Sequence, residues 1–250
     1  MISKEKKYGR SHIGEVHITK ESLGGYECKI VNGGSVKGHC TILIGKVIKE
    51  VPYIRICSGA VRYEYHPSVF GVGFLGEGDN TMKVKGIRSK SYQIWHCMLQ
   101  RCYDNKTQEK RPTYKNIVVC EEWHNYQNFT KWFKENYVEG WHLDKDLLLT
   151  GAGMYSPNTC VFIPQALNNF LTNNQTDNTS GYTGVSWRKG KGKWLAHISS
   201  RLEGRQICLG SFNTKEEAAK AYNERRKVYA EEWKQTMAGK LSMQALEAIQ

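Results

Sequence analysis

The residues best suited to chemistry lie in the segment HLDKDLLLTGAGMYSPNTCVFIPQALNN, residues 142–169. The pattern predicts a strand, a glycine turn, a second strand and a helix, with Asp144 on the first strand and Asn168 and Asn169 on the helix. A carboxylate and an amide that converge in this way offer oxygen ligands, which hard cations such as Mg²⁺ or Mn²⁺ prefer. Phosphate oxygens complete the shell of such a cation. The segment therefore predicts a metal site for phosphate chemistry.

The order and spacing of this segment resemble the ββα-metal core of HNH endonucleases, particularly the small HNH proteins of bacteriophages. By that resemblance Asp144 takes the metal-ligand position on the first strand and Asn168 the metal position on the helix. Asn158 takes the central position between them. The family places its general-base histidine directly after the aspartate, where this chain has Lys145. His142, which is two residues before Asp144 on the same strand face, is the substitute base that we expect.

Two alternatives to this site remain open. In the structural alternative, the residues LDKD form ion pairs at a strand end and the asparagines only cap a helix or begin a linker. In the functional alternative, the core is degenerate and inactive, and the chain is a DNA-binding regulator or a blocker of a host enzyme. Lys145 supports this second alternative, because a lysine is a poor base at neutral pH, although its charge can stabilise a phosphate transition state.

A second group of residues, from Gly184 to Tyr222, suits binding to a phosphate backbone. Apolar and polar side chains alternate there in three runs, which predicts three strands with one buried and one exposed face. Thr214 and Glu217 form a capping box that opens a helix. We expect that helix to cover the apolar face with Ala218, Tyr222, Tyr229 and Trp233. Six cationic residues stand against one glutamate between positions 182 and 213, so the exposed face is predicted to be cationic.

The residues GV-W, KW-A-I and LG-F-T-EEAA-AY resemble the AP2 DNA-binding domain, a three-stranded antiparallel sheet on one helix that enters the major groove. Plant members of that family usually have arginine where this chain has Ser186 and Ser199, so we expect fewer bidentate contacts to guanine. The resemblance places the DNA-binding residues at Thr183, Ser186, Arg188, Lys189, Lys193, His197, Ser199 and Gln206.

The whole chain is predicted to be a multi-domain α+β protein. Strand-like runs between glycine turns indicate a small β barrel or meander over residues 1–78, with YIRICSG as one of its strands. The glycine-rich segment GVGFLGEG is expected to be a turn-rich exit from this domain, because it lacks the Lys-Ser/Thr ending of a phosphate loop. The remaining parts are an HNH-like core with flanking amphipathic helices at 84–171, a flexible linker at 172–181, the AP2-like module at 182–236 and a tail at 237–250.

Composition points to the partner. A formal net charge of +12 and a pI near 9.2 indicate a polyanion, here double-stranded DNA, and no amphipathic basic helix points to a membrane. The eight cysteines form no CxxC pair, so no structural zinc is expected. No run of 18 apolar residues and no signal peptide occur, so we expect a cytoplasmic protein, in the host cytoplasm if a phage encodes it. The chain is thus predicted to be a metal-dependent endonuclease of the homing type that nicks DNA as a monomer or dimer.

Overall fold

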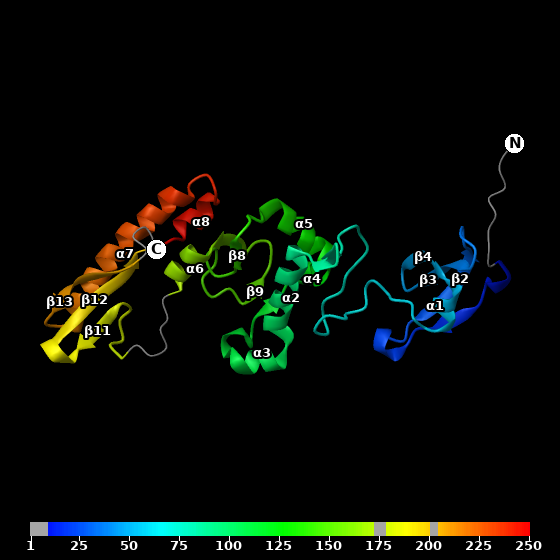
Figure 1. The fold of residues 1–250 in the computed structure, drawn as a ribbon, viewed down its shortest axis with the longest axis horizontal. Coiled ribbons are helices and arrows are strands. Elements are labelled where there is room, and N and C mark those ends of the chain that lie inside the picture. Colours follow the sequence, from blue (N-terminus) through cyan, green and yellow to red (C-terminus); the bar gives the residue numbers. More distant parts are fainter. Residues whose placement is uncertain (1–9, 173–178, 201–204) are drawn as a thin grey trace. The chain divides into compact units, whose positions relative to one another are not determined.

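The computed structural model describes residues 10–172, 179–200 and 205–250 and divides the chain into two compact units (Figure 1). These units are Met1–Lys134 and Glu135–Gln250. Both helices and strands build the chain, as the predicted α+β class requires. The predicted boundaries differ from this division, because the strands of the HNH-like segment fall in the same unit as the C-terminal sheet.

The first unit begins with an antiparallel four-stranded sheet in meander order. Its strands are β1 (Val16–Ile18), β2 (Glu27–Gly33), β3 (His39–Ile44) and β4 (Val47–Pro52). One face is buried in a core of Cys28, Ile30, Cys40, Ile42, Ile44, Val47, Ile56 and Val61. The prediction of a strand at YIRICSG was wrong, because the chain forms the short helix α1 (Tyr53–Cys57) there. Pro52 has no N–H for a strand ladder and precedes the first helical residue, which explains why the strand stops.

The glycine-rich segment GVGFLGEG packs closely against side chains of the same unit. A Cβ on Gly73 would lie 2.4 Å from Leu99 Cδ1, and one on Gly76 would lie 2.1 Å from Asn125 Oδ1. Backbone hydrogen bonds also join Phe74 to His124 and Tyr126. The glycines therefore permit close approach of the backbone to its neighbours, and the segment lies inside the first unit.

Helices form the rest of the first unit. A turn with β5 (Lys83–Val84) and β6 (Ile87–Arg88) leads to α2 (Lys90–Tyr103), α3 (Asn105–Lys110), β7 (Val118–Val119), α4 (Glu121–His124) and α5 (Tyr126–Asn136). Ser89 caps α2 by accepting the N–H of Tyr92. The two predicted amphipathic helices are confirmed as α2 and α5, and their apolar stripes are buried, including Trp95, Met98, Leu99, Tyr126 and Phe129. The short 3₁₀ turns are Arg10–His12, Glu21–Leu23, Pro112–Tyr114 and Lys189–Lys191.

The second unit begins with the segment that holds the predicted metal site. Its elements are β8 (Trp141–Asp144), β9 (Met154–Tyr155), β10 (Val161–Pro164) and α6 (Gln165–Leu171). β8 and β10 pair antiparallel, and α6 starts directly after β10 and contacts both strands. The predicted order of strand, turn, strand and helix is confirmed. We call β8, β10 and α6 the ββα element.

The C-terminal sheet consists of β11 (Val185–Arg188), β12 (Lys193–Ser200) and β13 (Arg205–Phe212), which are antiparallel in this order. The long helix α7 (Lys215–Met237) contacts all three strands. The capping box is confirmed: Thr214 Oγ1 accepts the N–H of Glu217 at 3.2 Å, and the Glu217 carboxylate accepts the N–H of Thr214 at 3.3 Å. Between the sheet and α7 lie Val185, Ala196, Ile198, Ala218, Ala219 and Tyr222.

The last turns of α7 join the sheet module to the ββα element. A helix of 23 residues is about 34 Å long, longer than the strands of this sheet, so its C-terminal end needs another surface. Trp233, which we expected to cover the sheet, packs in a core with the ββα element. The predicted tail closes the same core, partly through α8 (Met243–Glu247). That core contains Leu147, Ile163, Leu167, Ala230, Met237, Ala245 and Ile249.

Candidate nucleic-acid interface and ββα site

The uncovered face of the C-terminal sheet carries most of the predicted DNA-binding residues. Arg188 lies opposite Lys193, and Ser199 lies opposite Gln206. Residues directly opposite in an antiparallel pair point to the same side, so the alternation places one set of side chains away from α7. Leu195, which lies opposite both Ser186 and Ser211, is on this side as well, and so is Ser211. We call the following members of this set the open face: Ser186, Arg188, Lys193, His197, Ser199, Gln206 and Cys208. Thr183 lies just before β11, and Lys189 is exposed in the turn between β11 and β12.

Charge on this sheet has one sign. β11, β12 and β13 contain three cationic residues, Arg188, Lys193 and Arg205, and no Asp or Glu. Lys193 donates a hydrogen bond to the side chain of Asn213, which holds its ammonium group at the end of the strand. Such a surface attracts a phosphate backbone by releasing the counterions that surround it. Arg201 and Glu203 were counted in the predicted charge and lie outside the described residues.

A β-bulge in the middle of the sheet was not predicted. Ala196 pairs with Gly210, whereas the next residue, His197, pairs with Cys208, so β13 has one extra residue there. A bulge strengthens the local twist of a sheet, which changes how an open face meets a curved partner. Gly210 was the available signal, because a glycine inside an alternating run often marks a bulge.

Asp144 stabilises the turn that follows β8. Its Oδ1 accepts the N–H of Asp146 at 2.9 Å and the N–H of Leu147 at 2.7 Å. Burial raises the pKa of the Asp144 carboxyl group, and the two backbone hydrogen bonds oppose this effect. Among the described residues, the hydrogen bonds recorded for this carboxylate all go to Oδ1. Its other oxygen, Oδ2, is therefore the atom that remains for a cation.

The basic residues near Asp144 have different surroundings. His142 is exposed on β8 opposite Ile163, and Asp144 lies opposite Val161, so both lie on one face as predicted. The Lys145 side chain is only 11% exposed, and its Nζ lies 2.5 Å from Oδ1 of Asp146. This ion pair is the feature that the structural alternative predicted at LDKD.

The asparagines differ in how their side chains are used. Asn158 is exposed in the turn before β10, and hydrogen bonds between Ser156 and Thr159 hold that turn. The Asn169 Oδ1 accepts a hydrogen bond from Gln165 Nε2 at 3.1 Å, within α6. Asn168 is half-buried on the same helix, which contacts β8. Of the two amides, Asn169 is thus the one that is already held within its own helix.

The donor set fits a hard cation with a largely external shell. In the described ranges, no group of three or more His, Cys, Asp or Glu side chains is placed to hold a metal ion. One carboxylate and one amide oxygen are a small set, which Mg²⁺ tolerates because it keeps several waters and takes substrate phosphate oxygens. Such a site would need further oxygen ligands from outside the protein to complete it.

Comparisons with known proteins find no relative of this chain. No family model, no curated protein and no solved structure matches the chain. None of the helices in the described residues is long and apolar enough to cross a membrane. The function of the site therefore has to be argued from its own geometry.

Proposed function

We propose that the chain is a metal-dependent DNA endonuclease that holds duplex DNA on the open face and hydrolyses a phosphodiester bond at the ββα element. One observation carries this proposal: a cationic sheet face without acidic residues lies in the same compact unit as the ββα element with its half-buried carboxylate. The open face provides affinity, and the ββα element provides the reacting groups.

The roles of the reacting residues follow from their positions. Asp144 and the amide oxygen of Asn168 would hold Mg²⁺, which, when bound, polarises the scissile phosphate and makes water easier to deprotonate. His142 is exposed on the same strand face as Asp144, so its imidazole is available to accept the proton of the attacking water. Lys145 forms an ion pair with Asp146. We therefore assign it the role of holding the turn, and not the role of the general base.

A plasmid-nicking assay with Mg²⁺ or Mn²⁺ tests this proposal. We expect Asp144→Asn and Asp144→Ala to abolish metal-dependent nicking and to leave duplex affinity within a few fold, because affinity resides in the open face. The Asn variant keeps an oxygen for the two backbone N–H groups of the turn, so its loss of activity reports on the metal rather than on folding. Asp104→Asn is the matched control, since Asp104 caps α3 by accepting the N–H of Thr107 at 2.9 Å and its Asn variant keeps that oxygen.

The choice of base is a separate prediction. We expect His142→Ala to lower the nicking rate by about a hundredfold, the usual range for a lost general base. Lys145→Ala is expected to have a smaller effect, because its Nζ is already paired with Asp146. Rates are compared at saturating plasmid, and the reverse ranking would assign the base to Lys145.

A second candidate is a DNA-binding protein with an inactive ββα element, acting as a regulator or a blocker of a host enzyme. The Lys145–Asp146 ion pair and the turn-capping role of Asp144 favour this candidate, because both residues then have structural roles. Lys145→His restores the Asp-His pair of the HNH pattern. Failure of both the wild type and this variant to nick DNA that they bind tightly would establish the second candidate.

A further inference from the structure

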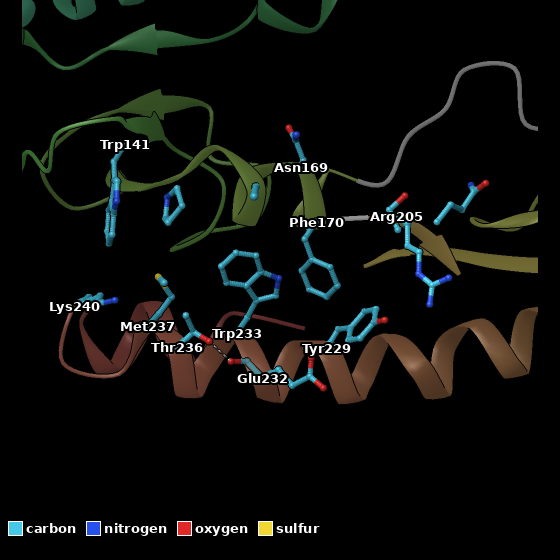
Figure 2. A pocket seen from close by; sticks show the side chains of 14 residues that line it. Trp141, Asn169, Phe170, Arg205, Tyr229, Glu232, Trp233, Thr236, Met237 and Lys240 are labelled. Atoms are coloured by element: carbon cyan, nitrogen blue, oxygen red, sulfur yellow. Dashed lines mark hydrogen bonds between the residues drawn. The ribbon is translucent and has the colours of Figure 1, made fainter. Parts of the chain in front are cut away.

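A cavity of about 1010 Å³ lies in the second unit between α6 and β8 on one side and α7 on the other (Figure 2). The cavity is open to solvent on one side, and its volume is at the upper end of the range for pockets that hold small organic ligands. The cavity is distinct from the positions assigned to catalysis, since His142, Asp144 and Asn168 do not line it.

The walls of the cavity are aromatic. They include Trp141 from β8, Phe170 from α6, and Tyr229 and Trp233 from successive turns of α7, as Figure 2 shows. Arg226 fixes one of these walls: its guanidinium group lies 4.4 Å from the centre of the Phe170 ring, and its Nη1 donates a hydrogen bond to the Phe170 carbonyl oxygen at 3.1 Å. Rigid aromatic walls suit a flat ligand that stacks.

One polar group of the cavity lacks a partner. Tyr229 is only 6% exposed, and within the described residues its hydroxyl group has no hydrogen-bond partner. A buried hydroxyl without a partner costs about 1–3 kcal/mol, so such groups are rare unless something else satisfies them. The oxygen itself has almost no exposed surface, so a ligand with a donor or acceptor on a ring edge would supply that partner once the Tyr229 ring turns toward it.

Charge at the ends of the cavity favours an anionic ligand. In Figure 2, Arg205 stands at the end near Tyr229, and Lys240 stands at the other end below Trp141. Glu232 is the one acidic residue among the described lining residues, so cations are in excess. An aromatic slot between two cations has the chemistry that recognises a nucleobase with its phosphates.

The cavity borders the open face at one end of the sheet. Ser199 and Gln206, which lie opposite each other at the end of β12 and β13, belong to the open face and also line the cavity. A base that leaves a duplex bound to the open face therefore has a route into the cavity. Extruding a base costs a few kcal/mol, and least where the base is already unpaired.

We propose that this cavity binds a nucleobase that is unpaired in the bound DNA, stacked between Phe170 and Trp233 and hydrogen-bonded to the Tyr229 hydroxyl group. The inference rests on the proposed binding of duplex DNA to the open face. It names the preferred substrate: duplex DNA that contains an unpaired nucleotide.

Fluorescence anisotropy with the full-length chain tests this inference. Two labelled duplexes of equal length are compared, one fully paired and one with a single unpaired adenosine in one strand. We expect the second duplex to bind about tenfold more tightly, since stacking of one base is worth that much or more. Tyr229→Phe should reduce this preference severalfold, while the thermal stability of the free protein stays the same or rises. Tyr222→Phe is the matched control, because Tyr222 is equally buried on α7 but lies under the sheet, and it should leave the preference unchanged.

The outcomes separate this inference from the proposed function. Equal, salt-dependent affinity for both duplexes would overturn the cavity assignment and leave the open face as a DNA interface. Absence of binding to either duplex would refute the proposed function itself, and the inference with it. Deoxyadenosine monophosphate is the third probe: if it quenches tryptophan fluorescence while the two duplexes bind equally, the ligand is a free nucleotide and the assignment to DNA is wrong.

Discussion

The two larger antiparallel sheets among the described residues differ on the faces that their cores leave uncovered. The strands of the N-terminal sheet contain two lysines and two glutamates, whereas those of the C-terminal sheet contain three cations and no acid. The N-terminal sheet also exposes apolar side chains, among them Val16, Ile18 and Ile48. The uncovered faces therefore distinguish a surface of balanced charge from a cationic surface, which we propose as the nucleic-acid interface. The net charge of the chain alone does not make this distinction.

Cations on the two sheets also differ in their partners. On the N-terminal sheet, Lys49 forms an ion pair with Glu64 at 2.7 Å, and Glu50 accepts hydrogen bonds from Ser35 and Val36. On the C-terminal sheet, Lys193 is held by the neutral amide of Asn213, and no acidic partner of it is found among the described residues. An uncompensated cation acts on a phosphate backbone, whereas a paired one mainly fixes local structure.

The largest expected effects on stability and on DNA binding come from variants that destabilise one sheet at a time. Gly184 has a φ of +70°, and a Cβ there would lie 2.3 Å from the Tyr222 ring and 2.5 Å from the His197 carbonyl oxygen. We expect Gly184→Ala to cost about 3 kcal/mol or more, from the left-handed backbone and from overpacking, and to abolish DNA binding as the sheet unfolds. Thermal unfolding and a DNA titration measure both effects.

Two other glycines serve as controls. Gly181→Ala has the same kind of backbone, with a φ of +79°, but nothing lies within 4 Å of its Cβ, so about 1–2 kcal/mol is expected. Gly45→Ala would meet Tyr63 at 2.6 Å under the N-terminal sheet, and it should destabilise the first unit without changing DNA affinity. Equal losses of DNA binding for Gly45→Ala and Gly184→Ala would show that the two sheets do not act separately.

A smaller effect, confined to the N-terminal sheet, is expected with pH. Hydrogen bonds from His12 and His17, together with one from Tyr53, lower the pKa of Glu15 from 4.5 to about 2. A carboxyl group with a lowered pKa stabilises the fold above its unfolded pKa, and this contribution is lost as the pH falls toward 2. The difference in melting temperature between wild type and Glu15→Gln should therefore be largest near neutral pH and vanish near pH 2. A difference that grows on acidification would show that Glu15 does not make these contacts.

The sequence predicts those parts of the fold in which local pattern and tertiary packing agree. Trp95, Met98 and Leu99 recur at helical spacing and are all buried, and Thr214 and Glu217 cap α7 as their spacing indicates. In YIRIC, β-branched residues favour a strand, but Pro52 and the burial of Ile56 in the core favour a helix. Trp233 lies at the same helical spacing as residues that cover the sheet, and periodicity does not tell which surface a long helix meets at its end.

The candidate site was predictable to a smaller extent. The order of elements placed Asp144 at the end of one strand and Asn168 on the following helix, and the structure has both positions. The capping of the turn by Asp144 and the pairing of Lys145 with Asp146 depend on loop conformation, which residue spacing does not specify. The aromatic cavity was missed for a similar reason, since Trp141, Phe170 and Trp233 come from three separate elements.

The salt dependence of duplex binding tests the central claim, that the open face of the C-terminal sheet is the DNA interface. Affinity of the wild type, of Arg188→Glu/Lys193→Glu and of Lys29→Glu/Lys37→Glu is measured from about 50 to about 200 mM salt. The two double variants change the net charge equally, but Lys29 and Lys37 are exposed in the N-terminal sheet and its adjoining loop. We predict that the first variant binds DNA about a hundredfold more weakly than the wild type. The magnitude of its slope of log K against log salt should fall by about 1.8, which is about 0.9 for each of two lost phosphate contacts. The second variant should match the wild type in both affinity and slope. Equal slopes and affinities for both variants would contradict the account.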